Sequence, residues 1–133
     1  MSTFNNKVAV IVGGTSGIGK ATAQELLKEG ATVHIVGRKV EKVDHQPKLI
    51  KHKVDITQSQ ELDLLIKRFE QENRIDYLVN ASGIFGPKPF LEHTREDYDA
   101  YLDLNSGLLI ITKDIAKKMK TGKGGSSENK EKM

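Results

Sequence analysis

Short apolar runs alternate with amphipathic stretches along the chain. The first run, Val8–Val12, has no polar position, as in a strand that is buried on both faces of a sheet. Similar runs predict four strands, over Lys7–Val12, Thr32–Val36, Leu49–Val54 and Ile75–Val79. Strands that alternate with helices form parallel sheets from βαβ units. The pattern therefore predicts an α/β domain with a parallel sheet.

Two helices are predicted between these strands. The first covers Gly17–Glu29, and Gly30 is placed to end it. Thr57–Gln60 has the residue order of a capping box, so Thr57 is predicted to cap the second helix. That helix carries the clearest amphipathic stripe of the chain, formed by Leu62, Leu65, Ile66 and Phe69. The link over Gly37–Lys48 is short and is predicted to hold little or no helix.

A third and longer helix is predicted after the fourth strand. Gly83–His93 contains Gly86, Pro87 and Pro89 and is predicted to be a loop. Thr94 then caps a helix over Arg95–Met119. The apolar side of this helix consists of Tyr101, Leu104, Leu108, Ile111 and Ile115.

The character of the sequence changes from Lys117 onward. Residues 117–133 contain six Lys and two Glu, and no Val, Ile, Leu, Phe, Tyr or Ala. Such a segment buries too little apolar surface to offset the entropy lost on ordering. Residues 1–119 are therefore predicted to form the domain, and residues 120–133 a disordered, Lys-rich tail.

Charge and composition exclude several classes of protein. The net charge is +3, but residues 117–133 carry +4, so the rest of the chain carries −1 and presents no basic face for nucleic acid. There is no Cys for disulfide or thiolate chemistry, and the four His have no ligand-like spacing, so no metal site is expected. No run approaches the ~18 apolar residues of a membrane span. The N-terminus lacks the order of a signal peptide, which makes a cytoplasmic protein the expectation.

A glycine-rich turn follows the first strand. Gly13, Gly17 and Gly19 have the spacing G-x-x-x-G-x-G. Glycines at such a turn let the backbone approach a pyrophosphate, and the first amides of the next helix bind the anion. A strand-to-helix turn that needs glycine only for packing is the alternative. The strand before the turn and the helix after it favour cofactor binding.

Further segments in the same order resemble the short-chain dehydrogenase/reductase family of NAD(P)-dependent oxidoreductases. The glycine signature of that family matches Val12–Gly19, with Val12 in place of its Thr. Asp55-Ile56 matches the family's acidic-aliphatic pair after the third strand, and Asn80-Ala81-Ser82-Gly83 matches its Asn-Asn-Ala-Gly segment in part. Asn105 matches the Asn on the following long helix. The resemblance extends from about Lys7 to Ser126, which is roughly the first half of such a protein.

The resemblance implies a Rossmann-like, three-layer fold that is truncated to about four parallel strands in the order 3-2-1-4. It implies that Asp55 accepts from the adenine amino group and that Asn105 holds a water in a proton relay. The implied cofactor-binding residues are Gly13, Thr15, Ser16, Gly17, Ile18, Gly19, Arg38, Asp55, Ile56, Asn80, Ala81, Ser82 and Gly83. Each has a simpler alternative: Asp55 could only start a turn, Asn80 could only satisfy backbone groups, and Asn105 could be an ordinary helix residue.

The end of the second strand indicates which dinucleotide is bound. Family members that prefer NAD carry an acid there, whereas this chain has Gly37 followed by Arg38 and Lys39. Arg38 can make a paired, charge-assisted contact with the 2′-phosphate of NADP. The sequence therefore favours NADP over NAD, although a solvated basic loop is the alternative.

The proton donor of the family is missing from the sequence. Family members use a Tyr with a Lys four residues later, together with a Ser that orients a small-molecule substrate. Four residues after Tyr77, Tyr98 and Tyr101 stand Ala81, Leu102 and Asn105, so no Tyr-x-x-x-Lys is present. We therefore expect an N-terminal fragment that keeps the cofactor half and is inactive alone. The alternative is a non-catalytic NADP-binding or interaction module that associates with a full-length relative.

A truncated sheet would expose apolar surface. We expect the fourth strand to be an open edge and part of the apolar side of the 95–119 helix to lose its cover. Either surface would then support a homo-oligomer.

Overall fold

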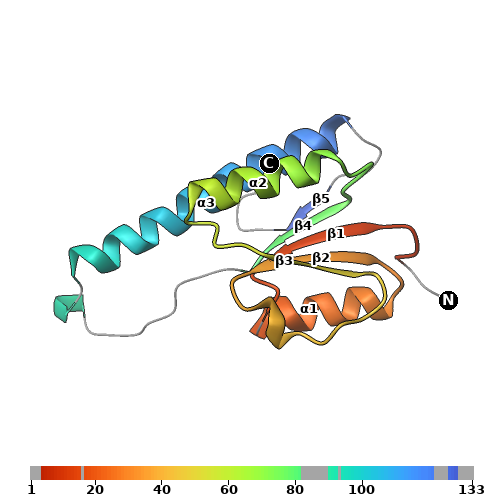
Figure 1. Cartoon of the computed structure of the whole chain (residues 1–133), viewed down its shortest axis with the longest axis horizontal. Coiled ribbons are helices and arrows are strands. Elements are labelled where there is room, and N and C mark those ends of the chain that lie inside the picture. The colour runs from red at the N-terminus through yellow and green to blue at the C-terminus, as the bar shows by residue number, and fades with distance from the viewer. Residues whose placement is uncertain (1–3, 16, 82–89, 93, 122–125, 129–133) are drawn as a thin grey trace.

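Strands and helices alternate in the structure, a computed structural model that describes residues 4–15, 17–81, 90–92, 94–121 and 126–128 (Figure 1). The strands are β1 (Val8–Val12), β2 (Thr32–Gly37), β3 (Leu49–Lys53), β4 (Tyr77–Asn80) and β5 (Ser126–Glu128). The helices are α1 (Gly17–Lys28), α2 (Ser59–Glu70) and α3 (Arg95–Thr121), with single 3₁₀ turns at Val40–Lys42 and Phe90–Glu92. The four predicted strands and three predicted helices are all present. The fourth strand begins two residues later than predicted, at Tyr77.

The sheet is parallel, and β1 lies at its centre. Its order is β3-β2-β1-β4-β5, so the predicted order 3-2-1-4 is confirmed and one strand is added. Val12, the last residue of β1, pairs with Val36 on one side and with Asn80 on the other. The carboxyl ends of β1, β2 and β4 therefore meet at one edge of the sheet, directly before the glycine-rich turn.

The fifth strand differs from two expectations. Residues 126–128 pair with Tyr77, Leu78 and Val79 of β4, so β4 is not the open edge of the sheet. Disorder was expected for these residues because they are polar. Edge pairing, however, uses backbone N–H and C=O groups, and it requires no apolar side chains on the strand that joins. In this structure the β4 edge proposed for self-association is occupied by β5.

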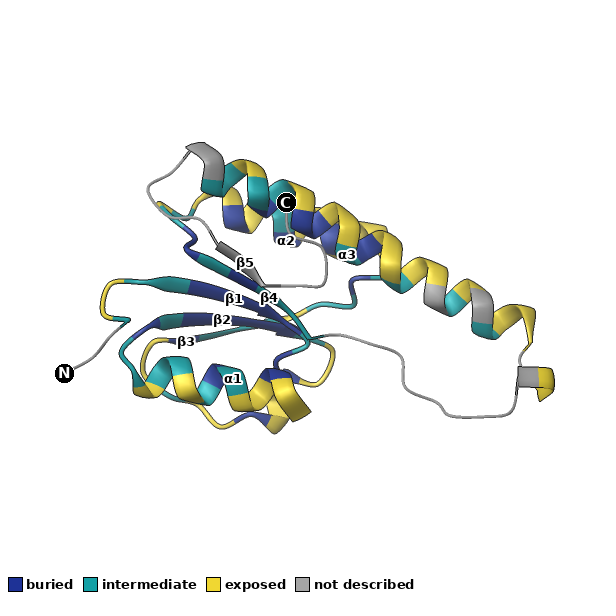
Figure 2. Cartoon of the chain, turned by 180° about the vertical axis from the view of Figure 1, so that it is seen from behind, coloured by how far each residue is buried: buried dark blue, intermediate teal, exposed yellow. Residues whose placement is uncertain are grey.

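The two faces of the sheet are covered differently (Figures 1 and 2). One face packs against α1 and carries a core of Ala9, Ile11, Ala23, Ala31, Val33, Ile35, Val40, Val43 and Leu49. The other face packs against α2 and α3, with a core of Val10, Val12, Val36, Ile56, Leu62, Leu65, Phe69, Ile75, Leu78, Ile111 and Ile115. The N-terminal half of α3 extends beyond the sheet (Figure 2). The predicted stripes of α2 and α3 thus face the core, except for Tyr101, whose side chain lies outside the described residues.

Of the two predicted helix caps, Thr94 is confirmed and Thr57 is not. Thr94 caps α3 as expected: the amide of Asp97 donates to Thr94 Oγ1 over 3.2 Å, and the amide of Thr94 donates to Asp97 Oδ2 over 2.7 Å. The prediction for Thr57 is wrong, because α2 begins at Ser59 after Gln58, which makes no side-chain capping bond. Thr57 is instead held by Asp55, whose carboxylate accepts from both the amide and the hydroxyl of Thr57.

A buried carboxylate joins the beginnings of β1 and β4. Asp76 Oδ2 accepts from the amide of Val8 over 2.8 Å, between residues that are 68 apart in sequence. Arg74 forms an ion pair with the same carboxylate. Burial raises the pKa of Asp76, but the hydrogen bonds from Arg74 and Val8 outweigh this effect and hold the pKa below its ordinary value. Asp76 therefore stays ionised and keeps β4 in register with β1.

Candidate cofactor site

The glycine-rich turn after β1 adopts a backbone conformation that glycine accommodates. Gly13 has a φ of 88° and Gly17 a φ of 58°, both in the left-handed region. A Cβ atom on Gly19 would lie 2.1 Å from the carbonyl oxygen of Gly13. The first turn of α1 therefore packs directly on the backbone of the loop, and a side chain at Gly19 would push the two apart.

The N-terminus of α1 opens this turn toward solvent. The helix begins at Gly17, carries no acidic residue in its first turn, and leaves Gly17 and Ile18 exposed. Unpaired amides and the positive end of the helix dipole favour an anion at such a position. The turn thus has the backbone geometry and electrostatics that bind a phosphate.

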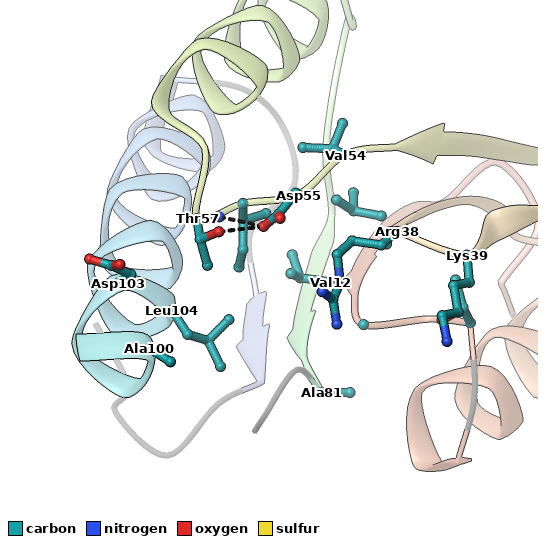
Figure 3. A pocket seen from close by; sticks show the side chains of 15 residues that line it. Val12, Arg38, Lys39, Val54, Asp55, Thr57, Ala81, Ala100, Asp103 and Leu104 are labelled. Atoms are coloured by element: carbon teal, nitrogen blue, oxygen red, sulfur yellow. Dashed lines mark hydrogen bonds between the residues drawn. The ribbon is translucent and has the colours of Figure 1, made fainter. Parts of the chain in front are cut away.

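A pocket of about 530 Å³ lies beside the turn, at the carboxyl ends of β1, β2 and β3. Six of the predicted cofactor residues line it: Gly13, Thr15, Arg38, Asp55, Ile56 and Ala81. In Figure 3, Arg38 and Lys39 lie on one side of this space and three residues of α3 lie on the other. Pockets at this edge of an open α/β sheet are where such folds bind their ligands.

Asp55 lines the pocket and is held in place by hydrogen bonds. Its Oδ1 accepts from the Thr57 amide over 3.0 Å and from the Thr57 hydroxyl over 2.6 Å. The amide of Asp55 in turn donates to Glu61 Oε1 of α2 over 3.1 Å. The simpler alternative for Asp55, that it starts a turn, is therefore observed. The turn also fixes the carboxylate at the pocket wall, so the observation is compatible with a contact to the ligand.

Helix α3 forms one wall of the pocket because it lies very near the segment after β3. A Cβ atom on Gly107 would lie 2.3 Å from the carbonyl oxygen of Ile56. This close approach brings Ala100, Asp103 and Leu104 to the pocket wall. A larger residue than glycine at position 107 would move this wall outward.

Asn80 and Asn105 lie outside the pocket lining. Asn80 Nδ2 donates to the hydroxyl of Thr112 over 3.0 Å and so ties the end of β4 to α3, while its buried Oδ1 has no partner among the described residues. Asn80 is thus bound to a side chain of α3 and not to the backbone groups that the alternative named, and its cofactor role stays a prediction. Asn105 lies on an exposed side of α3. The relay role of Asn105 stays a prediction.

The structure adds pocket residues that were not among the implied cofactor-binding residues. They are Val12, Val36, Gly37, Lys39, Val54, Thr57, Ala100, Asp103 and Leu104. Most of them follow directly from the position of a strand end. The three on α3 could have been found only from the docking of that helix. Of the predicted residues, Ser16, Ser82 and Gly83 lie outside the described part of the chain.

The described residues contain no group of three or more His, Asp or Glu side chains that could hold a metal ion. Among the described helices, none is both long enough and apolar enough to cross a membrane.

Comparison with known proteins identifies the class to which this fold and site belong. The short chain dehydrogenase family matches residues 7–127, and the chain belongs to this family. Its sequence is 36% identical to the uncharacterized oxidoreductase YvrD of Bacillus subtilis, over 77% of the chain and 41% of the relative. An uncharacterized oxidoreductase of Staphylococcus haemolyticus is 31% identical over 97% of the chain and 59% of that relative.

Solved structures of the same family share the fold. A short chain dehydrogenase from Leptospira borgpetersenii with bound NAD⁺ superposes with a TM-score of 0.80 and 25% identity, covering 88% of the chain and 47% of that protein. A 3-ketoacyl-(acyl-carrier-protein) reductase from Brucella melitensis, complexed with NADH, gives a TM-score of 0.78 and 25% identity. It is covered over 52% of its length. The chain thus spans about half the length of the relatives that it matches.

Proposed function

We propose that this chain binds NADP(H) through the glycine-rich turn and the adjacent pocket. The carrying observation is the convergence of Gly13, Arg38 and Asp55 on one pocket at the carboxyl ends of β1, β2 and β3. The turn binds the pyrophosphate, Asp55 and Ile56 bind the adenine, and Arg38 binds the 2′-phosphate. Family membership and the NAD⁺- and NADH-bound neighbours support a nicotinamide dinucleotide as the ligand.

The preference for NADP over NAD rests on the end of β2. Gly37 provides no carboxylate for the ribose hydroxyls, and a Cβ atom there would lie 2.7 Å from Thr15 Cγ2. Arg38 and Lys39 are both exposed and line the pocket, so their charges are available to a phosphate dianion. Guanidinium groups bind phosphate in a paired geometry that an ammonium cannot match, which makes Arg38 the main contact.

Substitution of Arg38 tests this assignment. We expect Arg38→Ala to weaken NADP⁺ binding by about 1.5–3 kcal/mol while sparing NAD⁺. Isothermal titration of both cofactors on the wild-type chain and the variant measures this difference. Lys42→Ala is the matched control, because Lys42 is exposed on the neighbouring 3₁₀ turn but does not line the pocket. Equal losses for the two cofactors would contradict a 2′-phosphate contact.

We also propose that the 133-residue chain binds the cofactor without catalysing hydride transfer. Reduction of a carbonyl requires a proton donor at the forming alkoxide, and the sequence contains no Tyr-x-x-x-Lys. NADPH oxidation with a panel of ketones is the direct assay. Binding without oxidation is the expected result, and turnover by the purified chain would overturn the proposal.

A second candidate function, a self-associating module, is favoured by the outer side of α3. Leu102, Leu109 and Ile110 are 64%, 62% and 48% exposed. Exposed acidic residues precede this apolar patch and exposed basic residues follow it, as at Asp99 and Lys113. An antiparallel pair of α3 helices about Ser106 would place Leu102 of one copy beside Ile110 of the other. The same pairing would set Asp99 against Lys113 twice, as a two-fold interface requires.

Charge exchange tests this pairing. Asp99→Lys should reduce dimer formation in sedimentation equilibrium, because it sets like charges against each other at both symmetric positions. The double variant Asp99→Lys/Lys113→Asp should restore it. A wild-type chain that stays monomeric at all concentrations, or a double variant that is no better than the single one, would contradict the α3 pairing.

A further inference from the structure

Two histidines from neighbouring strands form a pair inside the molecule. His34 of β2 is fully buried, and His52 of β3 is partly buried. His34 Nδ1 lies 2.9 Å from His52 Nε2, and the rings stack with their centroids 5.2 Å apart. Both rings contact the edge of Phe69 of α2, at centroid distances of 5.5 and 5.2 Å. The pair therefore occupies the contact between α2 and the β2–β3 side of the sheet.

The surroundings of the pair select one arrangement of protons. Only one proton can lie between His34 Nδ1 and His52 Nε2, because the two nitrogens are hydrogen-bonded to each other. Glu72 Oε1 lies 3.6 Å from His34 Nε2, and no other ion pair of His34 is found among the described residues. A carboxylate favours a proton on the facing nitrogen, so His34 carries its proton on Nε2 and accepts from His52 Nε2 through Nδ1. His52 Nδ1 is then the basic nitrogen that remains to bind an added proton.

The environment opposes this added proton. Burial, and to a smaller extent the positive charge of Arg68, lowers the pKa of His34 to about 4. Burial, His34 and Arg68 together lower the pKa of His52 to about 4, against a smaller opposing effect of Glu72. Lys51, Lys53 and Glu61 line the surface hollow beside His52, which gives solvent a route to the ring. A proton on the pair therefore has one acidic partner, Glu72, which is already held by Arg68 over 3.3 Å.

The pair is joined to the cofactor pocket by two short paths. Along β3, His52 is followed by Lys53 and then Val54, which lines the pocket and donates its amide to the Gly37 carbonyl over 3.0 Å. Along α2, Phe69 contacts both imidazoles, and Glu61 on the same helix holds the amide of Asp55. Any movement of α2 away from β3 would strain or break the Glu61 contact that positions Asp55.

We propose that the His34–His52 pair is a proton-binding site that opens the contact between α2 and β3 when it is protonated and thereby weakens dinucleotide binding at the adenine end of the pocket. This inference rests on the proposed cofactor function. The neutral pair stacks within a closed contact, whereas a charged pair places a cation in a buried space that Arg68 already makes positive. By linkage, bound cofactor opposes the uptake of the proton.

The size of the effect follows from the two protonation states. An imidazole released from the contact titrates near 6.5, and one within it near 4. Lowering the pH from 7.5 to 5.5 then favours the open contact by about 10-fold for one histidine and about 100-fold if both are released. The same change leaves the pyrophosphate charge of NAD⁺ constant, whereas a 2′-phosphate titrates near pH 6. NAD⁺ is therefore the probe that isolates the contribution of the protein.

Hydrogen exchange measured between pH 7.5 and 5.5 tests the proposal on the wild-type chain. After correction for intrinsic exchange, we expect protection of the α2 amides and of Val54 to fall by about 10- to 100-fold. Val10 of β1 is exposed only by global unfolding, so its amide should stay better protected than the α2 amides at both pH values. Saturating NAD⁺ should restore protection at pH 5.5. Unchanged α2 protection, or α2 amides that are as well protected as those of β1 at pH 5.5, would overturn the proposal.

Two variants assign the effect to the pair. His52→Phe keeps a ring against Phe69 but removes one titrating imidazole, so it should reduce the fall in α2 protection by about 10-fold. His45→Gln removes an exposed histidine from the β2–β3 link and should leave the dependence unchanged. If NAD⁺ and NADP⁺ both fail to bind at pH 7.5, the proposed cofactor function fails. If they bind at pH 7.5 but His52→Phe has the pH dependence of the wild type, only the inference about the pair fails.

Discussion

The two faces of the sheet bury different kinds of side chain. The buried core of the face under α1 is aliphatic, with Phe4 and Tyr77 packed against it, and its Ile35 and Val33 are completely buried. The face under α2 and α3 buries His34 and Thr112 as well, and it leaves Leu102 and Leu109 on the outside of α3. The first face therefore contributes mainly stability. The second face also links protonation, helix position and the wall of the pocket.

The difference between the faces indicates where a substitution should affect the pocket as well as stability. A change on the α1 face alters mainly the packing of apolar side chains. A change on the α2–α3 face alters a polar contact that is joined to Asp55 or Asn80, so it alters the site as well.

Loss of Phe69 should have the largest effect. Phe69 is 1% exposed and packs against both histidines, so Phe69→Ala should lower the free energy of unfolding by about 3–5 kcal/mol. Ile35→Val on the other face should cost about 0.5–1.5 kcal/mol. Urea denaturation measures both. Phe69→Leu, a smaller change, keeps the comparison measurable if the alanine variant does not fold. Similar losses for Phe69→Leu and Ile35→Val, with the pH dependence unchanged in both, would remove the distinction between the faces.

The pH dependence of stability should come from the α2–α3 face. The pKa of His34 and of His52 is lowered from 6.5 to about 4 in the folded chain, so the unfolded chain binds more protons as the pH falls. Stability is complete above pH 6.5 and is lost progressively toward pH 4. Between pH 7.5 and 5.5 the loss should be about 1.4 kcal/mol for each histidine. Urea denaturation at the two pH values measures it. A loss of the same size in a His34→Leu/His52→Leu variant would exclude the pair as its source.

The bond between Asn80 and Thr112 provides the third comparison. Thr112→Val keeps the shape of the side chain but leaves the Asn80 amide without its acceptor, which should cost about 1–3 kcal/mol. Thr22→Val removes an exposed hydroxyl bond to the Ile18 carbonyl on α1 and should change stability by less than about 0.5 kcal/mol. Thermal unfolding of the two variants provides the comparison. Equal shifts would mean that the Asn80 bond adds nothing beyond an ordinary helix contact.

Most of the fold could be predicted because its signals are local. The run Val8–Val12 and the stripe from Leu62 to Phe69 report burial through residues that are neighbours in sequence. The glycine-rich turn was predictable for the same reason, since the backbone at Gly13 and Gly17 requires unusual φ values. The short strand at 126–128 gave no such signal, because pairing at an edge depends on backbone groups and not on side chains.

The parts of the site that depend on register could not be predicted. His34 and His52 are 18 residues apart, and they meet only because β2 and β3 pair with His34 beside Ile50. The position of His34 within the apolar run from Val33 to Val36 did indicate burial, although it did not identify a partner. The α3 wall of the pocket depends on the close approach of Gly107 to Ile56, which the sequence alone does not reveal.

The bond from Val8 to Asp76 has a consequence for the order in which the chain folds. One neighbour of β1 is β2, which follows after a single helix, whereas the other is β4, which the Asp76 carboxylate joins across 68 residues. Closing a longer loop costs more chain entropy, so nearby partners meet first. We expect β1, α1 and β2 to assemble early and β4 to insert late. The bond from Val8 to the Asp76 carboxylate would then form when most of the sheet is already paired. The dinucleotide pocket, which needs the wall formed by α3, would then become competent only in the last step of folding.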